Sequence, residues 1–177
     1  MLTRTMEAAV EAHELQSLQT PIKDKYRDDP SVALVTLRAS GELGAEQVSC
    51  AVDVGKQLVE AGLHPASGGD GSLACSGDML LQALVACAGV TLRSVAVNRG
   101  LDVTGTVTAE GVLDFRGTLG VDRDAPVGFV SIGLHFDLVT DAGSDEIEAL
   151  LRATERYCVV YQTIRSGTEV SISRSVG

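Results

Sequence analysis

The sequence predicts an α+β protein in which a mostly antiparallel sheet packs around one long, buried helix. Two observations point to this class. Residues 75–99 form a stretch that is apolar on almost every face: between Met79 and Leu92, only Gln82 and Thr91 are clearly polar. The segments on either side alternate apolar and polar residues with the period of two that is typical of half-buried strands. Helices that stand apart from an antiparallel sheet define the α+β class.

The length and charge of the chain limit its domain organisation and its partners. A chain of 177 residues has room for one domain, and we expect an N-terminal helical extension over 1–29 ahead of a domain over 30–177. The net charge of -10 offers no basic stripe, so we expect binding neither to nucleic acid nor to an anionic membrane. The first residues turn acidic where a secretory signal is apolar, which predicts a cytoplasmic protein. Arg93 interrupts the best candidate for a membrane span.

The central helix is predicted from Cys75 to Arg99. Ser76 or Asp78 can cap its first turn, and Gly100 can close its far end. Cys87 lies at its middle. A thiol at that place is either a small core residue or a reactive group in a hidden pocket.

Strands are predicted before this helix. Residues 31–38 and 45–54 form a hairpin around a turn at 40–44, with Cys50 on the apolar face of the second strand, most simply as a core residue. A third short strand is expected at 56–63. The Gly- and Ser-rich loop over 64–77 lacks the lysine of a phosphate-binding loop, and a flexible connection is the better interpretation. Long loops border sites, so His64 is a candidate pocket residue, although an exposed loop histidine is the commoner case.

Strands and helices are also predicted after Gly100. Two strands over 101–115 and 127–140 alternate, with a bulge or bend near 109–120. In the second strand, the side chains expected to face the core are Val130, Ile132, Leu134, Phe136 and Leu138, while His135 points away. A helix begins at Ser144 with Asp145 and Glu146 in its first turn, where acidic groups favour the helix dipole. Cys158 follows on its buried side, and a last strand is predicted over 168–176.

The cysteines are the candidate chemical groups. The chain has four, at positions 50, 75, 87 and 158, with no CxxC pair, and its three histidines are far apart, so neither a metal nor another cofactor is expected. A peroxide-reducing thiol must be ionised near neutral pH, and a second thiol must capture the sulfenic acid that forms. Cys87 and Cys158 could form such a pair, but spacing and periodicity alone favour core packing.

Several segments together resemble the OsmC/Ohr family of thiol peroxidases. These segments are DMLLQALVACAGVTL, Asp102, DFRG at 114–117, VGFVSI and ERYCVVYQT. The resemblance implies an intertwined α+β homodimer with two sites at the subunit interface. It also implies that Cys87 attacks an organic hydroperoxide, that Cys158 closes a disulfide, and that a dithiol reductant restores both thiols.

The chain departs from the motifs of that family at three points. Gly77 stands where the family has a glutamate, with Asp78 beside it; the turn at 40–44 has Glu42 and no arginine; and Val159 follows the second cysteine in place of proline. The candidate binding residues are therefore Arg38, His64 and Asp78, and Arg27 and Arg93 are further cations. A second hypothesis is an OsmC-like protein that binds an apolar ligand or senses redox state without efficient turnover.

Overall fold

The computed structural model describes residues 13, 17, 19–21, 24, 28–29, 40–43, 49–53, 58–120 and 122–176, with the backbone alone for 40–43, 49–53 and 58. Most of the predicted N-terminal helical extension (1–29) and all of the predicted strand at 31–38 lie outside these residues. The described positions from 13 to 28 are helical. The division of the chain at residue 30 stays a prediction.

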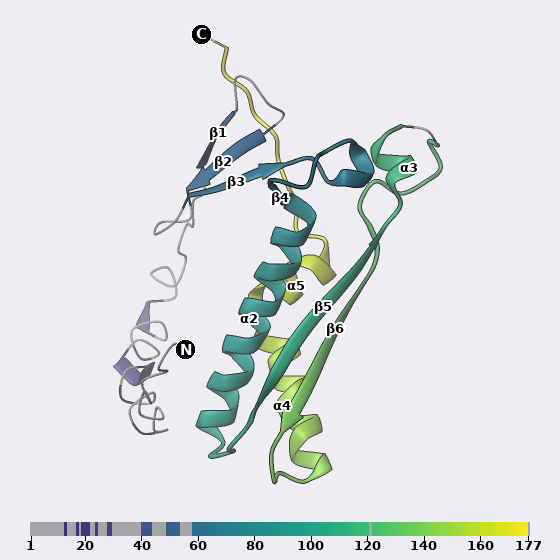
Figure 1. Cartoon of the computed structure of the whole chain (residues 1–177). Coiled ribbons are helices and arrows are strands. Elements are labelled where there is room, and N and C mark those ends of the chain that lie inside the picture. Colours follow the sequence, from purple (N-terminus) through teal and green to yellow (C-terminus); the bar gives the residue numbers. More distant parts are fainter. Residues whose placement is uncertain are drawn as a thin grey trace, which may run out of the picture.

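A small sheet stands at one end of the long helix (Figure 1). It contains β1 (Ser40–Leu43), β2 (Ser49–Asp53), β3 (Leu58–Gly62) and β4 (Ala74–Cys75), in that order. Neighbouring strands are antiparallel except β3 and β4, which are parallel. The third short strand is thus confirmed. The turn predicted at 40–44 is wrong, because residues 40–43 pair with β2 from Ser40 opposite Asp53 to Leu43 opposite Cys50.

The central helix, α2 (Ser76–Asn98), follows β4 directly. Its N-cap is Cys75, which makes no side-chain capping bond, so the prediction that Ser76 or Asp78 caps it is wrong. The reason is that Cys75 is still extended, paired with Gly62 in the sheet, which places Ser76 inside the first turn. Gly100 closes the far end as predicted, with φ of 66° and its N–H bonded to the Val97 carbonyl at 3.1 Å.

Among the residues that the structure describes, one stripe of α2 is buried. It consists of Leu84, Ala88, Leu92 and Ala96, spaced four residues apart. Val90, on another face, is 72% exposed.

Among the described residues, α2 is the one helix that is long and apolar enough to span a membrane. By length and composition, therefore, the expectation that Arg93 excludes a membrane span is wrong. One arginine leaves the mean hydropathy of the most apolar window at 1.8, and the core helix of a soluble protein meets the same criterion.

A long hairpin of β5 (Thr104–Leu113) and β6 (Phe129–Val139) runs beside α2 (Figure 1). The predicted alternation holds from Ser131 onward, with His135 exposed. Val130 is exposed rather than buried, contrary to the prediction, and Phe129 is half-buried instead. A β-bulge causes this change of phase: Val112 pairs with Ser131 but Leu113 pairs with Phe129, which skips Val130. The Phe129 ring then lies over Gly111, where a Cβ would clash with it.

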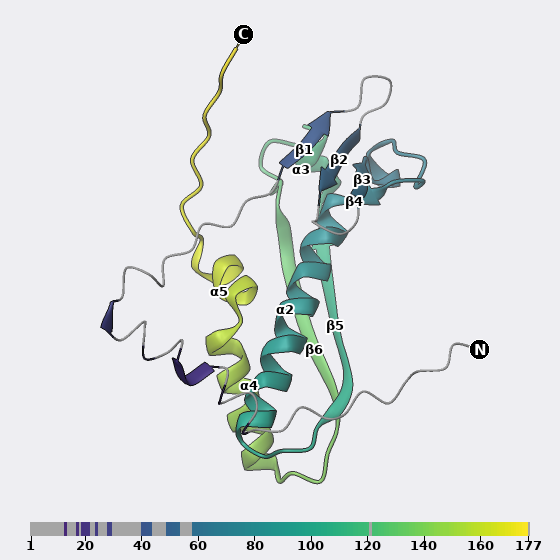
Figure 2. The ribbon, with the colours of Figure 1, turned by 90° about the vertical axis from the view of Figure 1, so that its left-hand side faces the viewer.

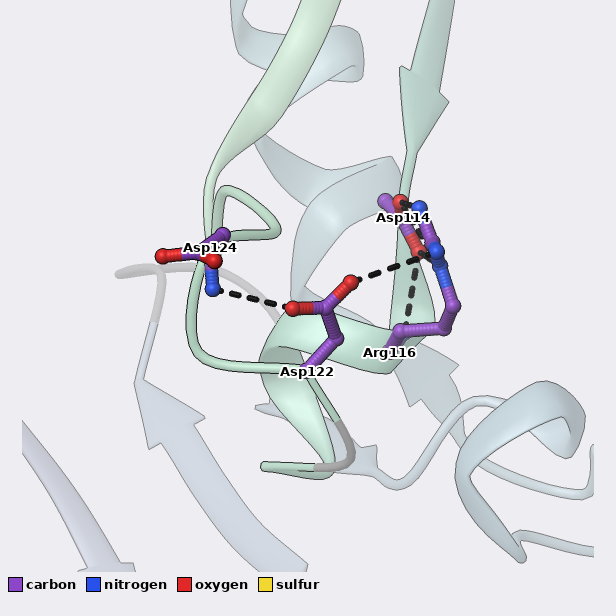
Figure 3. Close-up of polar contacts among 4 residues, drawn as sticks. All are labelled: Asp114, Arg116, Asp122 and Asp124. Carbon is purple, nitrogen blue, oxygen red and sulfur yellow. Dashed lines mark hydrogen bonds and ion pairs between the residues drawn. The ribbon is translucent and has the colours of Figure 1, made fainter.

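The connection between the two strands contains the short helix α3 (Phe115–Thr118). Arg116 binds the carboxylate of Asp114 at 2.6 Å and that of Asp122 at 3.3 Å, and the backbone N–H of Asp124 donates to Asp122 at 3.0 Å (Figure 3). Hydrogen bonding to Arg116 lowers the pKa of Asp114. These contacts lie within the loop that joins β5 to β6, and because they are solvent-exposed they contribute little to stability.

The last two helices are α4 (Ser144–Tyr157) and α5 (Val159–Ser166), which lie beside α2 (Figure 2). Asp145 and Glu146 occupy the first turn of α4 as predicted, and Glu146 also accepts the N–H of Gly143 at 3.0 Å. The core forms where α4, α2 and the hairpin meet, and its buried members are Leu92, Ala96, Val103 and Leu150.

The strand predicted over 168–176 is absent from the structure. This segment is an extended chain that forms no strand with the described residues (Figure 2), and Ile172 is 95% exposed. The reason is that a strand needs a second backbone, and no strand in the described part of the chain pairs with this segment.

Candidate thiol site

The structure brings Cys87 and Cys158 together although they are far apart in the sequence. Cys87 lies midway along α2 and is half-buried, whereas Cys158 is 1% exposed at the break between α4 and α5. The break arises at Cys158, whose ψ of 107° is extended. The N–H of Cys158 ends α4 on the Thr154 carbonyl at 2.9 Å, and its C=O begins α5 by accepting the N–H of Gln162 at 3.0 Å.

The surroundings of Cys87 favour its thiolate. Burial by itself raises the pKa of Cys87, but hydrogen bonds outweigh it and the pKa is lowered below the ordinary value of a cysteine. The donors are the backbone N–H of Val160, the side chain of Cys158, the backbone N–H of Val159 and the side chain of Thr91. Two of these are N–H groups at the start of α5, where a helix leaves its amides unpaired and its dipole attracts negative charge.

Cys158 has the opposite tendency. Burial raises the pKa of Cys158, and hydrogen bonding and charge repulsion from Cys87 raise it further. The backbone N–H groups of Tyr161 and Val160 oppose these effects without cancelling them. The arrangement therefore favours ionisation of Cys87 over ionisation of Cys158.

A groove of about 870 Å³ lies between α2, β6 and the α4–α5 pair, and we call it the α5 groove. Its wall is mostly apolar, formed by Leu80, Leu84, Phe129, Ile132, Leu134 and Phe136. Glu155, Tyr161 and Arg165 supply the polar groups. Neither cysteine lines the groove, but two of their neighbours do: Leu84 stands three residues before Cys87 on α2, and the N–H of Tyr161 bonds Cys158.

A second groove, of about 630 Å³, borders α2 and α4, and we call it the Thr91 groove. Its lining includes the polar side chains of Thr91, Ser94, Asn98, Arg99 and Tyr157. Thr91 belongs both to this groove and to the set of donors around Cys87.

The two described candidate binding residues, Asp78 and His64, make their contacts away from the thiols. Asp78 is exposed in the first turn of α2, nine residues or about 13 Å of helix from Cys87, and lines a separate groove against β5. His64 stacks on Phe115 with ring centroids 5.0 Å apart and accepts the N–H of Ala66 through Nδ1. Arg38 lies outside the described residues.

Two further residues, the candidate cation Arg93 and the motif position Gly77, can be placed. Arg93 donates to the Val103 carbonyl at 2.8 Å, a contact that ties α2 to the chain just before β5. At Gly77, the position of the family glutamate, an added Cβ would lie within van der Waals distance of Phe129, Leu113 and Cys75. Within the described residues, no group of three His, Cys, Asp or Glu side chains could hold a metal ion.

Sequence reasoning missed the donors around Cys87. Thr91 did have a signal, since it is one of two polar side chains in an apolar helix and stands one turn after the cysteine. The amides of Val159 and Val160 had none, because any residue type other than proline carries a backbone N–H.

The comparisons with known proteins agree with the fold. The sequence model of the family described as OsmC-like protein matches residues 69–173. An OsmC-like protein from Mycoplasma pneumoniae superposes with a TM-score of 0.62 at 16% identity, over 74% of this chain and 88% of that one. An OsmC-like protein of unknown function from Vibrio cholerae superposes with a TM-score of 0.60 at 13% identity, over 73% and 94% of the two chains.

A third solved structure has a name that refers to chemistry. It is an organic hydroperoxide resistance protein OsmC, a predicted redox protein, from Legionella pneumophila, with a TM-score of 0.54 at 20% identity over 75% of this chain and 90% of that one. A search of curated protein sequences finds no match. The predicted α+β, OsmC-like fold is confirmed.

Proposed function

Because the chain belongs to the OsmC-like protein family, we propose that it is a cysteine-based peroxidase that reduces organic hydroperoxides to alcohols in defence against oxidative stress. Cys87 is the attacking thiolate and Cys158 is the resolving thiol. The Legionella protein is named for organic hydroperoxide resistance, and the similarity of its fold supports this proposal.

One observation carries this proposal: the two thiols interact directly and are shifted in opposite directions. The pKa of Cys87 is lowered and that of Cys158 is raised. A peroxidase needs two thiols that differ in this way, because the first sulfur must be ionised to attack oxygen while the second stays protonated until the sulfenic acid has formed.

The reaction proceeds in two steps. The Cys87 thiolate attacks the terminal oxygen of the hydroperoxide, an S–O bond forms, the O–O bond breaks, and the alkoxide takes a proton to leave as the alcohol. Cys158, once it has lost its proton, attacks the sulfur of the sulfenic acid, so that an S–S bond forms and hydroxide leaves as water. An external dithiol then reduces the disulfide and is itself oxidised.

The α5 groove indicates the class of hydroperoxide. A mostly apolar wall and about 870 Å³ of space suit a lipophilic chain better than hydrogen peroxide, which would leave that wall in contact with water. We expect the groove to hold the organic part of the substrate.

The proposal extends to the assembly and location of the protein. Proteins of this family are typically homodimers, and the exposed apolar faces of α2 give a second copy of this chain a surface to cover. We propose a homodimer that acts in the cytoplasm without metal or other cofactor, its partners being the hydroperoxide and a dithiol reductant.

The test is hydroperoxide consumption with a dithiol reductant. Wild type is compared with Cys87→Ser and with Cys75→Ser, which removes a described thiol outside the pair. We expect Cys87→Ser alone to abolish turnover, and cumene hydroperoxide to be consumed faster than hydrogen peroxide. Equal turnover by wild type and Cys87→Ser would end the proposal.

A second function is favoured by the same apolar groove: binding of an apolar ligand, or redox sensing, without efficient turnover. An apolar ligand that copurifies and is identified by mass spectrometry, with Cys87 and Cys158 unreacted after hydroperoxide treatment, would support it. Rapid formation of a Cys87–Cys158 disulfide would speak against it.

A further inference from the structure

The break between α4 and α5 at Cys158 costs backbone hydrogen bonds. In a continuous helix, the amides of residues 159–161 would bond the carbonyls of residues 155–157. The extended ψ of Cys158, 107°, turns those amides away, so the break gives up these bonds. A continuous helix is therefore a competing arrangement of this segment, and the break needs contacts that stabilise it.

One of the carbonyls left by the break is bonded by a side chain from the other helix. The side-chain amide of Gln162, in α5, donates from Nε2 to the Glu155 carbonyl, in α4, at 2.7 Å. In a continuous helix the Val159 amide would take this carbonyl. A carbonyl oxygen only accepts, so the Gln162 side chain must present its NH₂ group there. Gln162 thus replaces the first of the bonds that the break gives up.

Gln162 also contacts the start of α5 through its backbone. Its N–H donates to the Cys158 carbonyl at 3.0 Å, and the residue is half-buried. Neighbouring hydroxyls bond within their own helix, Thr154 to the Leu150 carbonyl in α4 and Ser166 to the Gln162 carbonyl in α5. Among the described residues, Gln162 is the one whose side chain hydrogen-bonds from one of these two helices to the other.

The residue held between these bonds is Cys158. It is 1% exposed, and its N–H ends α4 on the Thr154 carbonyl at 2.9 Å. Its ψ is the dihedral that differs between the broken and the continuous arrangement. The break therefore determines which groups of α5 surround the Cys158 sulfur.

We propose that Gln162 is a positioning residue for the resolving thiol: its side-chain amide stabilises the break between α4 and α5 and so fixes the direction in which α5 leaves Cys158. This inference rests on the proposed function, in which Cys158 attacks the sulfenic acid of Cys87. Without the Gln162 donor, the segment shifts toward a continuous helix, and Cys158 is less often placed to attack.

The experiment measures how fast Cys158 closes the disulfide onto Cys87. Oxidised glutathione first forms a mixed disulfide on Cys87, the more exposed of the two thiols, and one reduced glutathione leaves. Cys158 then loses its proton and attacks the Cys87 sulfur, which releases the second reduced glutathione. Rapid acid quenching and peptide mass spectrometry separate the two steps. The variants are Gln162→Met and Gln162→Glu, which match glutamine in length and helix propensity but carry no N–H donor.

We expect both variants to slow the closing step about three- to tenfold, which corresponds to the loss of one hydrogen bond, and to leave the first step unchanged. Ser166→Ala is the matched control, because it removes a side-chain bond of α5 that does not cross the break, and it should close the disulfide at the wild-type rate. A purely structural role of Gln162 would lower the urea midpoint without changing the closing rate. Closing at the wild-type rate in either Gln162 variant, or equal slowing by Ser166→Ala, would overturn the proposal.

The glutathione readout needs no hydroperoxide, so it separates this inference from the proposed function. Slower closing in the variants of a protein that consumes no hydroperoxide would leave the role of Gln162 intact and refute the peroxidase. Unchanged closing rates in an active peroxidase would do the reverse. A wild-type protein that closes no Cys87–Cys158 disulfide at all would overturn both.

Discussion

Replacing Val159 by proline would remove one amide donor from Cys87 without disturbing the backbone. Val159 is the first residue of α5, a position that proline favours because its N–H has no partner within the helix. Proline also requires an extended residue before it, and Cys158 already has φ of -73° and ψ of 107°. The Val159 side chain is 69% exposed, so its loss should cost little stability.

The size of the effect follows from the single bond that is lost. A hydrogen bond to a charged group contributes about 1.5 kcal/mol at the lower end of its range, which is about tenfold in thiolate population at about 1.4 kcal/mol per decade. The more basic sulfur recovers part of this through higher nucleophilicity. We therefore expect Val159→Pro to slow Cys87 alkylation about three- to tenfold at pH 7.

The assay compares Val159→Pro with Val159→Ala, which shortens the same side chain but keeps the N–H. The Val159 amide lowers the pKa of Cys87, so its removal must raise that pKa. The alkylation midpoint must therefore move to higher pH. Circular dichroism checks that both variants are folded. If the two profiles coincide, the amide end of α5 does not stabilise the thiolate and the reasoning is refuted.

Three further predictions concern the second thiol and the packing. Cys158→Ser should let one equivalent of hydroperoxide oxidise Cys87 and then stall, with a sulfenic acid trapped by a β-diketone; sustained turnover would contradict this. Leu150→Ala, at a fully buried core position, should lower the free energy of unfolding in urea by about 2–5 kcal/mol and leave the Cys87 alkylation profile unchanged. Gly111→Ala should destabilise by about 1–3 kcal/mol, because its Cβ would displace the Phe129 ring; an unchanged urea midpoint would show that the ring moves freely.

Periodicity predicted the elements whose pattern is uninterrupted. The apolar stretch predicted α2, and the acidic first turn located the start of α4 at Ser144. Alternation failed at Val130, because a bulge adds one residue to the strand and reverses the faces beyond it. It failed again over 168–176, since alternation shows that a segment can be a strand but not that a second backbone is available to pair with it.

The candidate site was predictable only in part. Local spacing left Cys87 and Cys158 as either core or reactive residues, and the resemblance to a family paired them. The helix start at Val159 depends on the extended backbone of Cys158, which the sequence pattern did not reveal. For that reason the search for an activating group considered cations such as Arg93, which in the structure donates to the Val103 carbonyl.

The unequal exposure of the two thiols sets the order of exchange once they are joined in a disulfide. With Cys158 enclosed by the α4–α5 junction and only Cys87 open to solvent, an incoming reductant can reach the sulfur of Cys87 first. In the proposed mechanism the mixed disulfide would then form on α2, with Cys158 as the departing group. It leaves toward the N–H groups of Val160 and Tyr161, which favour the charge that it carries away.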